Sequence, residues 1–184
     1  NKRRTTLTID VPGNTDSVAL FSGGLDSTIG AFDLLARGKN PLLVSHAYRG
    51  DSGIQSNVLQ HMPRPVVRFG ANLHPVNLRD ATSDITMRSR SFNFLALAAV
   101  AATVVAEVTD ANLVPLIIPE NGFIALNAPL TPRRVGSLST RTTHPYFLGK
   151  IQSVFDQVGI PATINNPYEF KTKGEMFREC LNPL

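Results

Sequence analysis

Residues 18–27 read Val18-Ala19-Leu20-Phe21-Ser22-Gly23-Gly24-Leu25-Asp26-Ser27, and an apolar-periodic segment follows over 28–35. Four apolar residues that run into a short turn and then into helical spacing predict a buried strand, a tight loop and a helix that starts near Ser27. Glycine adopts backbone angles that other residues avoid, so the N–H groups of such a loop can converge on an anion. The N-terminus of the following helix favours the same anion. The stretch therefore predicts a phosphate-binding loop.

Asp26 lies within this loop, where its charge would repel a bare phosphate. A carboxylate beside a phosphate indicates a metal ion between them, and Asp26 is therefore our candidate metal ligand, for Mg²⁺. The loop is not of the Walker type, because no Gly-Lys-Ser/Thr follows it, and it lacks the G-x-G-x-x-G spacing of dinucleotide-binding proteins.

The rest of the chain alternates between strand and helix patterns, which is typical of an α/β fold with a doubly wound parallel sheet, a Rossmann-like three-layer α/β/α arrangement. Apolar runs predict further strands at 41–46, 66–69, 113–118 and 161–164. Helical spacing predicts helices at 50–61, 91–109 and 147–158, and a last helix that Thr172 and Glu175 begin as a capping box. Alternation before Pro12 predicts an edge strand, whereas 125–146 shows no regular pattern.

Composition places the chain among globular proteins. It has 184 residues, 42% hydrophobic, with a net charge of +4, which suits a single domain over 1–184 and polyanionic ligands without establishing nucleic-acid binding. The chain has no initiator Met and stops just after a helical segment, so we expect a fragment of a longer protein. Its single cysteine, Cys180, excludes a disulfide framework or a Cys-rich zinc site within these residues and indicates a reducing, cytoplasmic setting. The apolar-rich segment 92–108 ends in Glu107 and predicts a buried helix rather than a membrane span.

Polar residues follow two of the predicted strands, at the edge where doubly wound sheets bind ligands. His46 ends the second strand, where it either contacts a nucleotide or is satisfied by the backbone. Glu120 and Asn121 follow the fourth strand, where they bind Mg²⁺, ribose or an acceptor substrate, or simply form a Pro-Glu-Asn-Gly turn. We favour a site for Glu120 and Asn121, because Asp26 should point into the same crevice.

Basic residues appear at three further places. Arg88 and Arg90 lie at the start of the long helix, where an arginine fork and a helix N-terminus favour the same anion. Lys171 and Lys173 precede the last helix. The region 133–150 is rich in arginine and hydroxyl groups, which fits either a cradle over phosphates or a solvated loop.

The string Ser22-Gly23-Gly24-Leu25-Asp26-Ser27 resembles the pyrophosphate loop of the N-type ATP pyrophosphatases, the PP-loop superfamily. The resemblance implies ATP and Mg²⁺ as cofactors. It also implies nucleotide contacts from all six loop residues, adenine near His46, and phosphates facing Arg88 or Arg90 and Lys173. The Arg88–Phe92 region and the Lys-Thr-Lys-Gly-Glu stretch are most similar to the 7-cyano-7-deazaguanine synthase (QueC-like) branch. The Pro-Glu-Asn-Gly and Ser-Thr-Arg-Thr-Thr-His-Pro strings are similar to its QatC relatives in the Qat anti-phage systems. That synthase carries a four-cysteine zinc site, for which this sequence has only Cys180.

The resemblance implies an ATP-dependent, AMP-forming ligase. A carboxylate of a small molecule or protein would attack the α-phosphate, pyrophosphate would leave, and a nitrogen nucleophile would displace AMP. Partner proteins of a defence system would then be expected. Two alternatives stay open: a tRNA-modifying PP-loop enzyme, which would bind nucleic acid, and a non-catalytic nucleotide-binding protein.

Overall fold

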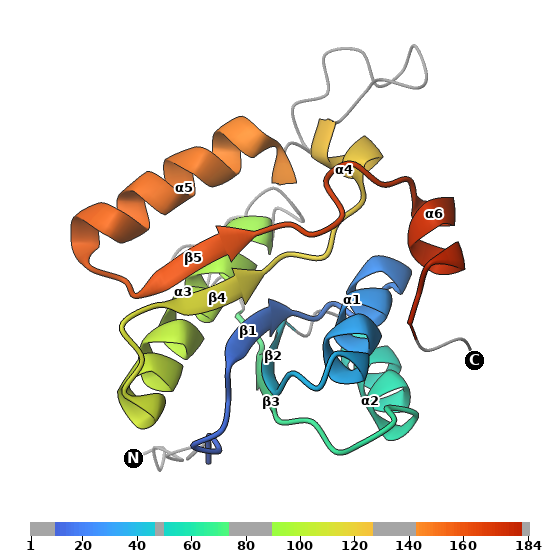
Figure 1. Ribbon diagram of the computed structural model, residues 1–184, viewed down its shortest axis with the longest axis horizontal. Helices are drawn as coiled ribbons and strands as arrows, with labels where there is room; N and C mark the ends of the chain where they lie inside the picture. Colours follow the sequence, from blue (N-terminus) through green and yellow to red (C-terminus); the bar gives the residue numbers. More distant parts are fainter. Residues whose placement is uncertain (1–9, 47–49, 74–89, 127–142, 182–184) are drawn as a thin grey trace, which may run out of the picture.

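The computed structural model describes residues 10–46, 50–73, 90–126 and 143–181 (Figure 1). Its five strands form one all-parallel sheet: β1 (Ser17–Leu20), β2 (Pro41–His46), β3 (Arg68–Ala71), β4 (Val114–Ile117) and β5 (Ala162–Asn165). The helices are α1 (Leu25–Ala36), α2 (Asp51–Gln60), α3 (Arg90–Thr109), α4 (Gly122–Leu126), α5 (Pro145–Val158) and α6 (Lys173–Arg178). The predicted α/β class with a parallel sheet is confirmed.

The order of the strands is β3-β2-β1-β4-β5, so the chain builds one half of the sheet and then returns to start the other half beside β1. Val18 of β1 lies opposite Leu116 of β4, and Ala19 lies opposite Ile117. The direction of winding therefore changes between β1 and β4. In open parallel sheets, this change opens a crevice at the carboxyl ends of the two strands.

Helices cover both faces of the sheet, which gives three layers (Figure 1). Successive residues of a strand point to opposite faces. Val18 packs in a cluster with α3 and α5, whereas its neighbour Ala19 packs in a second cluster with Ala31 of α1 and Val58 of α2. Buried apolar side chains on both faces explain why β1, β2 and β4 are continuous apolar runs in the sequence.

Helix α3 is the longest helix and covers most of one face of the sheet. Within the part of the chain that the structure describes, it alone is long and apolar enough to cross a membrane by length and composition. It contacts β1, β2 and β4, and seven of its residues are buried: Phe94, Leu95, Ala98, Ala99, Ala101, Ala102 and Val105. The alanines allow close packing on the sheet, as expected for the core helix that the sequence predicted.

Several boundaries differ from the predictions. Helix α1 begins at Leu25, two residues early, because Gly24 is extended (φ −78°, ψ 168°) and serves as the N-cap. Strand β3 lies two residues later than 66–69, since its register follows β2. Helix α4 was not predicted, because its first residues read as a turn. Residues 10–12 form no strand, and the rest of the predicted edge strand lies outside the described residues.

Candidate functional site

Residues 22–27 connect β1 to α1 and form a tight turn. Gly23 has φ +82°, and a Cβ there would lie 3.1 Å from the side chain of Gln55, so the position requires glycine on both counts. The hydroxyl oxygens of Ser22 and Ser27 are 3.1 Å apart, and Ser27 donates a hydrogen bond to the carbonyl of Gly24 (3.0 Å). No side chain caps α1, which leaves the N–H groups of its first turn for another acceptor.

Asp26 lies in the first turn of α1 and is 5% exposed. Its Oδ2 accepts hydrogen bonds from the side-chain amide (2.6 Å) and the backbone N–H (3.3 Å) of Asn121. Its Oδ1 has no hydrogen-bond partner among the described residues, but it lies 3.1 Å from Nζ of Lys173 as an ion pair. A buried carboxylate needs compensation of its charge, and Lys173 supplies it at Oδ1.

Asn121 and Glu120 leave β4 at the opposite wall of the crevice. The carbonyl of the Asn121 side chain accepts from the backbone N–H of Ile124 (3.2 Å), so its amide is engaged on both sides. Asn121 thus holds Asp26 and orders the start of α4. The backbone of Glu120 is fixed by Asn166, whose side-chain amide donates to the Glu120 carbonyl (2.8 Å). Glu120 is thereby held at the cleft, which it lines.

Burial, the largest cause, and the negative charge of Asp26 together raise the pKa of Glu120 from 4.5 to about 7, while the positive charge of Lys173 opposes both effects. Near neutral pH the carboxyl group therefore exists in both protonation states. Such a group can accept or release a proton, or bind a cation, at little cost.

The cleft itself has a volume of about 250 Å³ and lies over the carboxyl ends of β1 and β4, beside the start of α3. One part of its lining is polar and the other apolar: Leu20, Ser22, Ser27, Arg90, Ser91, Phe94, Leu95, Ile118, Pro119, Glu120 and Thr143. This mixture fits a ligand with a charged end and an apolar body.

Of the predicted arginines, Arg90 is the first residue of α3 and lines the cleft. Its guanidinium group forms an ion pair with Asp51 at the start of α2 (2.5 Å), and it lies 5.9 Å from the ring of Phe94. Arg88 lies outside the described residues. Of the two arginines, the structure therefore places Arg90 at the cleft.

The two candidate lysines have different partners. Lys173 reaches Asp26, whereas Lys171 pairs with Glu179 (2.8 Å) on the surface. His46 is 3% exposed and does not line the cleft; its ring meets Phe94 edge-on at 5.7 Å between centroids. Its two ring nitrogens have no hydrogen-bond partner among the described residues.

Gln55 of α2 is a supporting residue that the sequence did not reveal. It is fully buried, and its side-chain amide donates to the carbonyls of Ser22 (3.3 Å) and His46 (3.4 Å) while its carbonyl accepts from Arg68 (3.1 Å). Gln55 thus ties the turn after β1 to the end of β2. It is the one buried residue of a helix with little amphipathic pattern, so no sequence signal marks it.

Thr143 is a second addition, since its buried hydroxyl lines the cleft and has no hydrogen-bond partner in the part of the chain that is described. It belongs to the predicted basic region 133–150, of which 133–142 lie outside the described residues. The remainder enters α5, which His144 caps by accepting a hydrogen bond from the N–H of Tyr146 (3.2 Å).

The carboxylates of Asp26 and Glu120 offer donor atoms that fit Mg²⁺. Asp26 Oδ1 has no hydrogen-bond partner among the described residues, and Glu120, which lines the cleft, lies near enough for the charge of Asp26 to raise its pKa. Hard oxygen donors suit this ion, which is commonly held by one or two carboxylates and completes its coordination with water and phosphate. Within the described ranges, no three His, Cys, Asp or Glu side chains are grouped closely enough to hold a metal by themselves.

Neither a scan against protein-family models nor a search of curated proteins finds a match to this chain. The fold and the site define a five-stranded, all-parallel α/β protein of Rossmann-like type with a polar cleft at the switch point of its sheet.

Proposed function

We propose that this protein is an ATP-dependent, AMP-forming ligase of the PP-loop type, most similar to the QueC-like branch. One observation carries the proposal: residues 22–27 follow β1 at the switch point, their buried Asp26 pairs with Lys173, and Ser22, Ser27, Glu120 and Arg90 line the cleft beside them. The turn offers N–H groups and hydroxyls to a pyrophosphate, and the side chains around it supply the charges that a nucleotide triphosphate requires.

Some residues of the site bind the phosphates of ATP, and others neutralise their negative charge. Ser22 and Ser27 contact the pyrophosphate end of ATP, together with the N–H groups of the first turn of α1. Asp26 and Glu120 hold Mg²⁺, which supplies charge neutralisation on the phosphates when bound. Lys173 and Arg90 stabilise the negative charge that develops on the leaving pyrophosphate.

The reaction needs little covalent help from side chains. A carboxylate oxygen of the substrate forms a bond to the α-phosphorus, and the bond from that phosphorus to the bridging oxygen breaks, so that pyrophosphate leaves with the electron pair. Ammonia then attacks the carbonyl carbon of the acyl adenylate, AMP leaves, and a proton is lost as the amide forms. This proton passes to the surrounding water, so no side chain is needed as the base.

The proposal extends to the setting of the reaction. The Pro-Glu-Asn-Gly string, which resembles that of QatC-type proteins, lies beside the cleft, where Glu120 lines it and Asn121 holds Asp26. On that resemblance we extend the proposal to a cytoplasmic enzyme of anti-phage defence that acts on a small-molecule or protein carboxylate.

The test is to identify the products of ATP. The protein is incubated with α-labelled ATP, Mg²⁺, ammonium and a panel of carboxylates that includes a deazaguanine acid, and the nucleotides are separated. We expect AMP and pyrophosphate in equal amounts with one acceptor. ADP as the product contradicts the proposal, and ATP binding without turnover on any acceptor favours the non-catalytic alternative. Turnover that requires added tRNA favours the tRNA-modifying alternative.

A further inference from the structure

One face of α1 carries two buried carboxylates. Asp26 and Asp33 are seven residues apart, which places them on the same side of the helix two turns from each other. Between them, Ile29 packs in a small buried cluster with Tyr168 and Met176. The C-terminal segment of the chain therefore covers the face of α1 that begins at the cleft.

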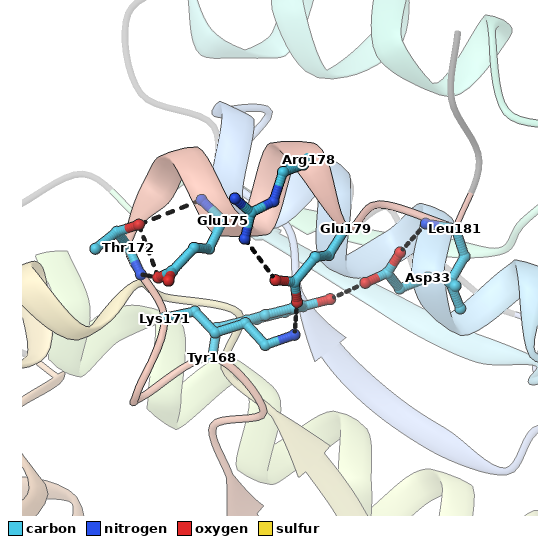
Figure 2. Close-up of polar contacts among 8 residues, drawn as sticks. All are labelled: Asp33, Tyr168, Lys171, Thr172, Glu175, Arg178, Glu179 and Leu181. Atoms are coloured by element: carbon cyan, nitrogen blue, oxygen red, sulfur yellow. Dashed lines mark hydrogen bonds and ion pairs between the residues drawn. The ribbon is translucent and has the colours of Figure 1, made fainter.

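Asp33 fastens this segment from both sides. Its Oδ2 accepts a hydrogen bond from the hydroxyl of Tyr168 (2.6 Å), and its Oδ1 accepts one from the backbone N–H of Leu181 (2.8 Å), as Figure 2 shows. Tyr168 precedes α6 in the chain, and Leu181 follows it. A single buried carboxylate thus anchors both flanks of α6 on α1.

The start of α6 is fixed by its own capping box. Thr172 accepts from the backbone N–H of Glu175 (3.2 Å), and the Glu175 carboxylate accepts from the N–H of Thr172 (2.8 Å), also drawn in Figure 2. Lys173 is the first residue of this helix, so the position of α6 on α1 sets the direction in which the Lys173 side chain leaves the backbone. The Lys173 side chain is 52% exposed and has little packing of its own to place its ammonium group.

We propose that Tyr168 and Asp33 are positioning residues, which set the ammonium group of Lys173 beside Asp26 by seating α6 on α1. The inference rests on the proposed function only where Lys173 contacts ATP. Tyr168 does not line the cleft and acts through Lys173. Burial and the hydrogen bond to Asp33 raise the pKa of Tyr168, so its hydroxyl remains a donor over the whole working pH range.

The first test is a double-mutant cycle on ATP affinity. Tyr168→Phe removes only the hydroxyl and keeps the ring against Ile29 and Met176. Calorimetry with Mg²⁺-ATP on the whole chain should show about three-fold weaker binding for Tyr168→Phe and about ten-fold weaker binding for Lys173→Met. The double variant should bind no more weakly than Lys173→Met alone, because the hydroxyl acts through the lysine. Additive losses overturn the proposal.

The second test needs no nucleotide. NMR of the lysine ammonium groups, with Lys173 assigned by Lys173→Met, should show the slowly exchanging signal of an ion-paired lysine in the wild type and its loss in Tyr168→Phe. The matched control is Tyr146→Phe on α5, a tyrosine that is 71% exposed, which should leave the Lys173 signal unchanged. An unaltered Lys173 signal in a folded Tyr168→Phe variant overturns the positioning role. If ATP does not bind the wild type, the proposed function fails while this test still decides the positioning.

Discussion

The two carboxylates on the inner face of α1 are equally buried but differently satisfied. Asp33 is 6% exposed, and each of its oxygens accepts a short hydrogen bond, one from Tyr168 and one from Leu181. Asp26 is 5% exposed, but its Oδ1 has no hydrogen-bond partner among the described residues and pairs only with the ammonium group of Lys173 there. Buried polar groups are nearly always hydrogen-bonded. The difference supports a structural role for Asp33, and it supports our proposal that Asp26 binds a ligand.

Neutralising Asp26 should give the largest effect. Asp26→Asn keeps the shape and can still accept a hydrogen bond from Asn121, but it loses the negative charge. We expect AMP formation to fall by about 10³-fold, the order of magnitude for loss of one electrostatic group at a reacting centre. Urea unfolding should show a stability change of less than about 1 kcal/mol, since Lys173 is half solvated and loses little.

Loss of stability with activity retained would contradict this assignment of Asp26. Asp26 would then have a structural role, like the one that we assign to Asp33.

Truncating Asp33 should have the opposite profile. Asp33→Ala leaves the Tyr168 hydroxyl and the Leu181 N–H without their acceptor, which should lower the free energy of unfolding by about 3 kcal/mol. Urea denaturation followed by circular dichroism measures the loss. A variant as stable as the wild type would show that α6 is held by the apolar contacts of Met176 alone.

The pH dependence of stability should report the charge on Asp26. Because the pKa of Glu120 is about 7 in the folded state and 4.5 when unfolded, the folded protein binds the extra proton. The stabilisation is complete below pH 4.5 and is lost as the pH rises through 7, a fall of about 2 kcal/mol between pH 5 and 7. Glu120→Gln should flatten this part of the profile. Asp26→Asn should shift it to lower pH, and an unshifted profile would show that Asp26 does not act on Glu120.

The smallest effect is expected at Lys171, which is two residues from Lys173 but pairs with the exposed Glu179. Exposed ion pairs contribute little, so Lys171→Met should leave the melting temperature unchanged and the Mg²⁺-ATP dissociation constant within about 1.5-fold. If Lys171→Met weakened ATP binding as much as Lys173→Met does, the phosphates would be stabilised by general positive charge rather than by the ammonium group of Lys173.

The sequence alone predicted those parts of the structure whose signal lies within one short, contiguous stretch of residues. Strand β2 was predicted with the same bounds that the structure shows, because it is a short, mostly apolar run that starts directly after Asn40 and is buried along its whole length. The turn at residues 22–27 was equally visible, since its glycines and hydroxyls are contiguous. Strand β3 was misplaced by two residues, because its register is set by β2 and not by its own apolar residues.

Long-range contacts were beyond the sequence. The resemblance implied Lys173 rather than Lys171 at the phosphates, but the sequence did not show what Lys173 would contact. The start of α6 at Lys173 and the position of α6 on α1 bring it to Asp26. Gln55 could not be predicted for a related reason, since its three partners come from the turn after β1, from β2 and from β3. Within the candidate site, residues 22–27 are contiguous in the sequence, whereas the other residues come from separate elements.

The N-terminus of α1 has a thermodynamic consequence. Helices α5 and α6 begin with side-chain caps, whereas α1 begins at Gly24 with none. An anion bound there would act as the missing cap. Ligand binding and the stability of α1 would then be thermodynamically linked. The melting temperature should then climb with the logarithm of nucleotide concentration above the dissociation constant, as for any ligand that binds only the native state. A thermal-shift series with ATP, ADP, AMP and inorganic pyrophosphate would rank these anions as caps before any substrate is known.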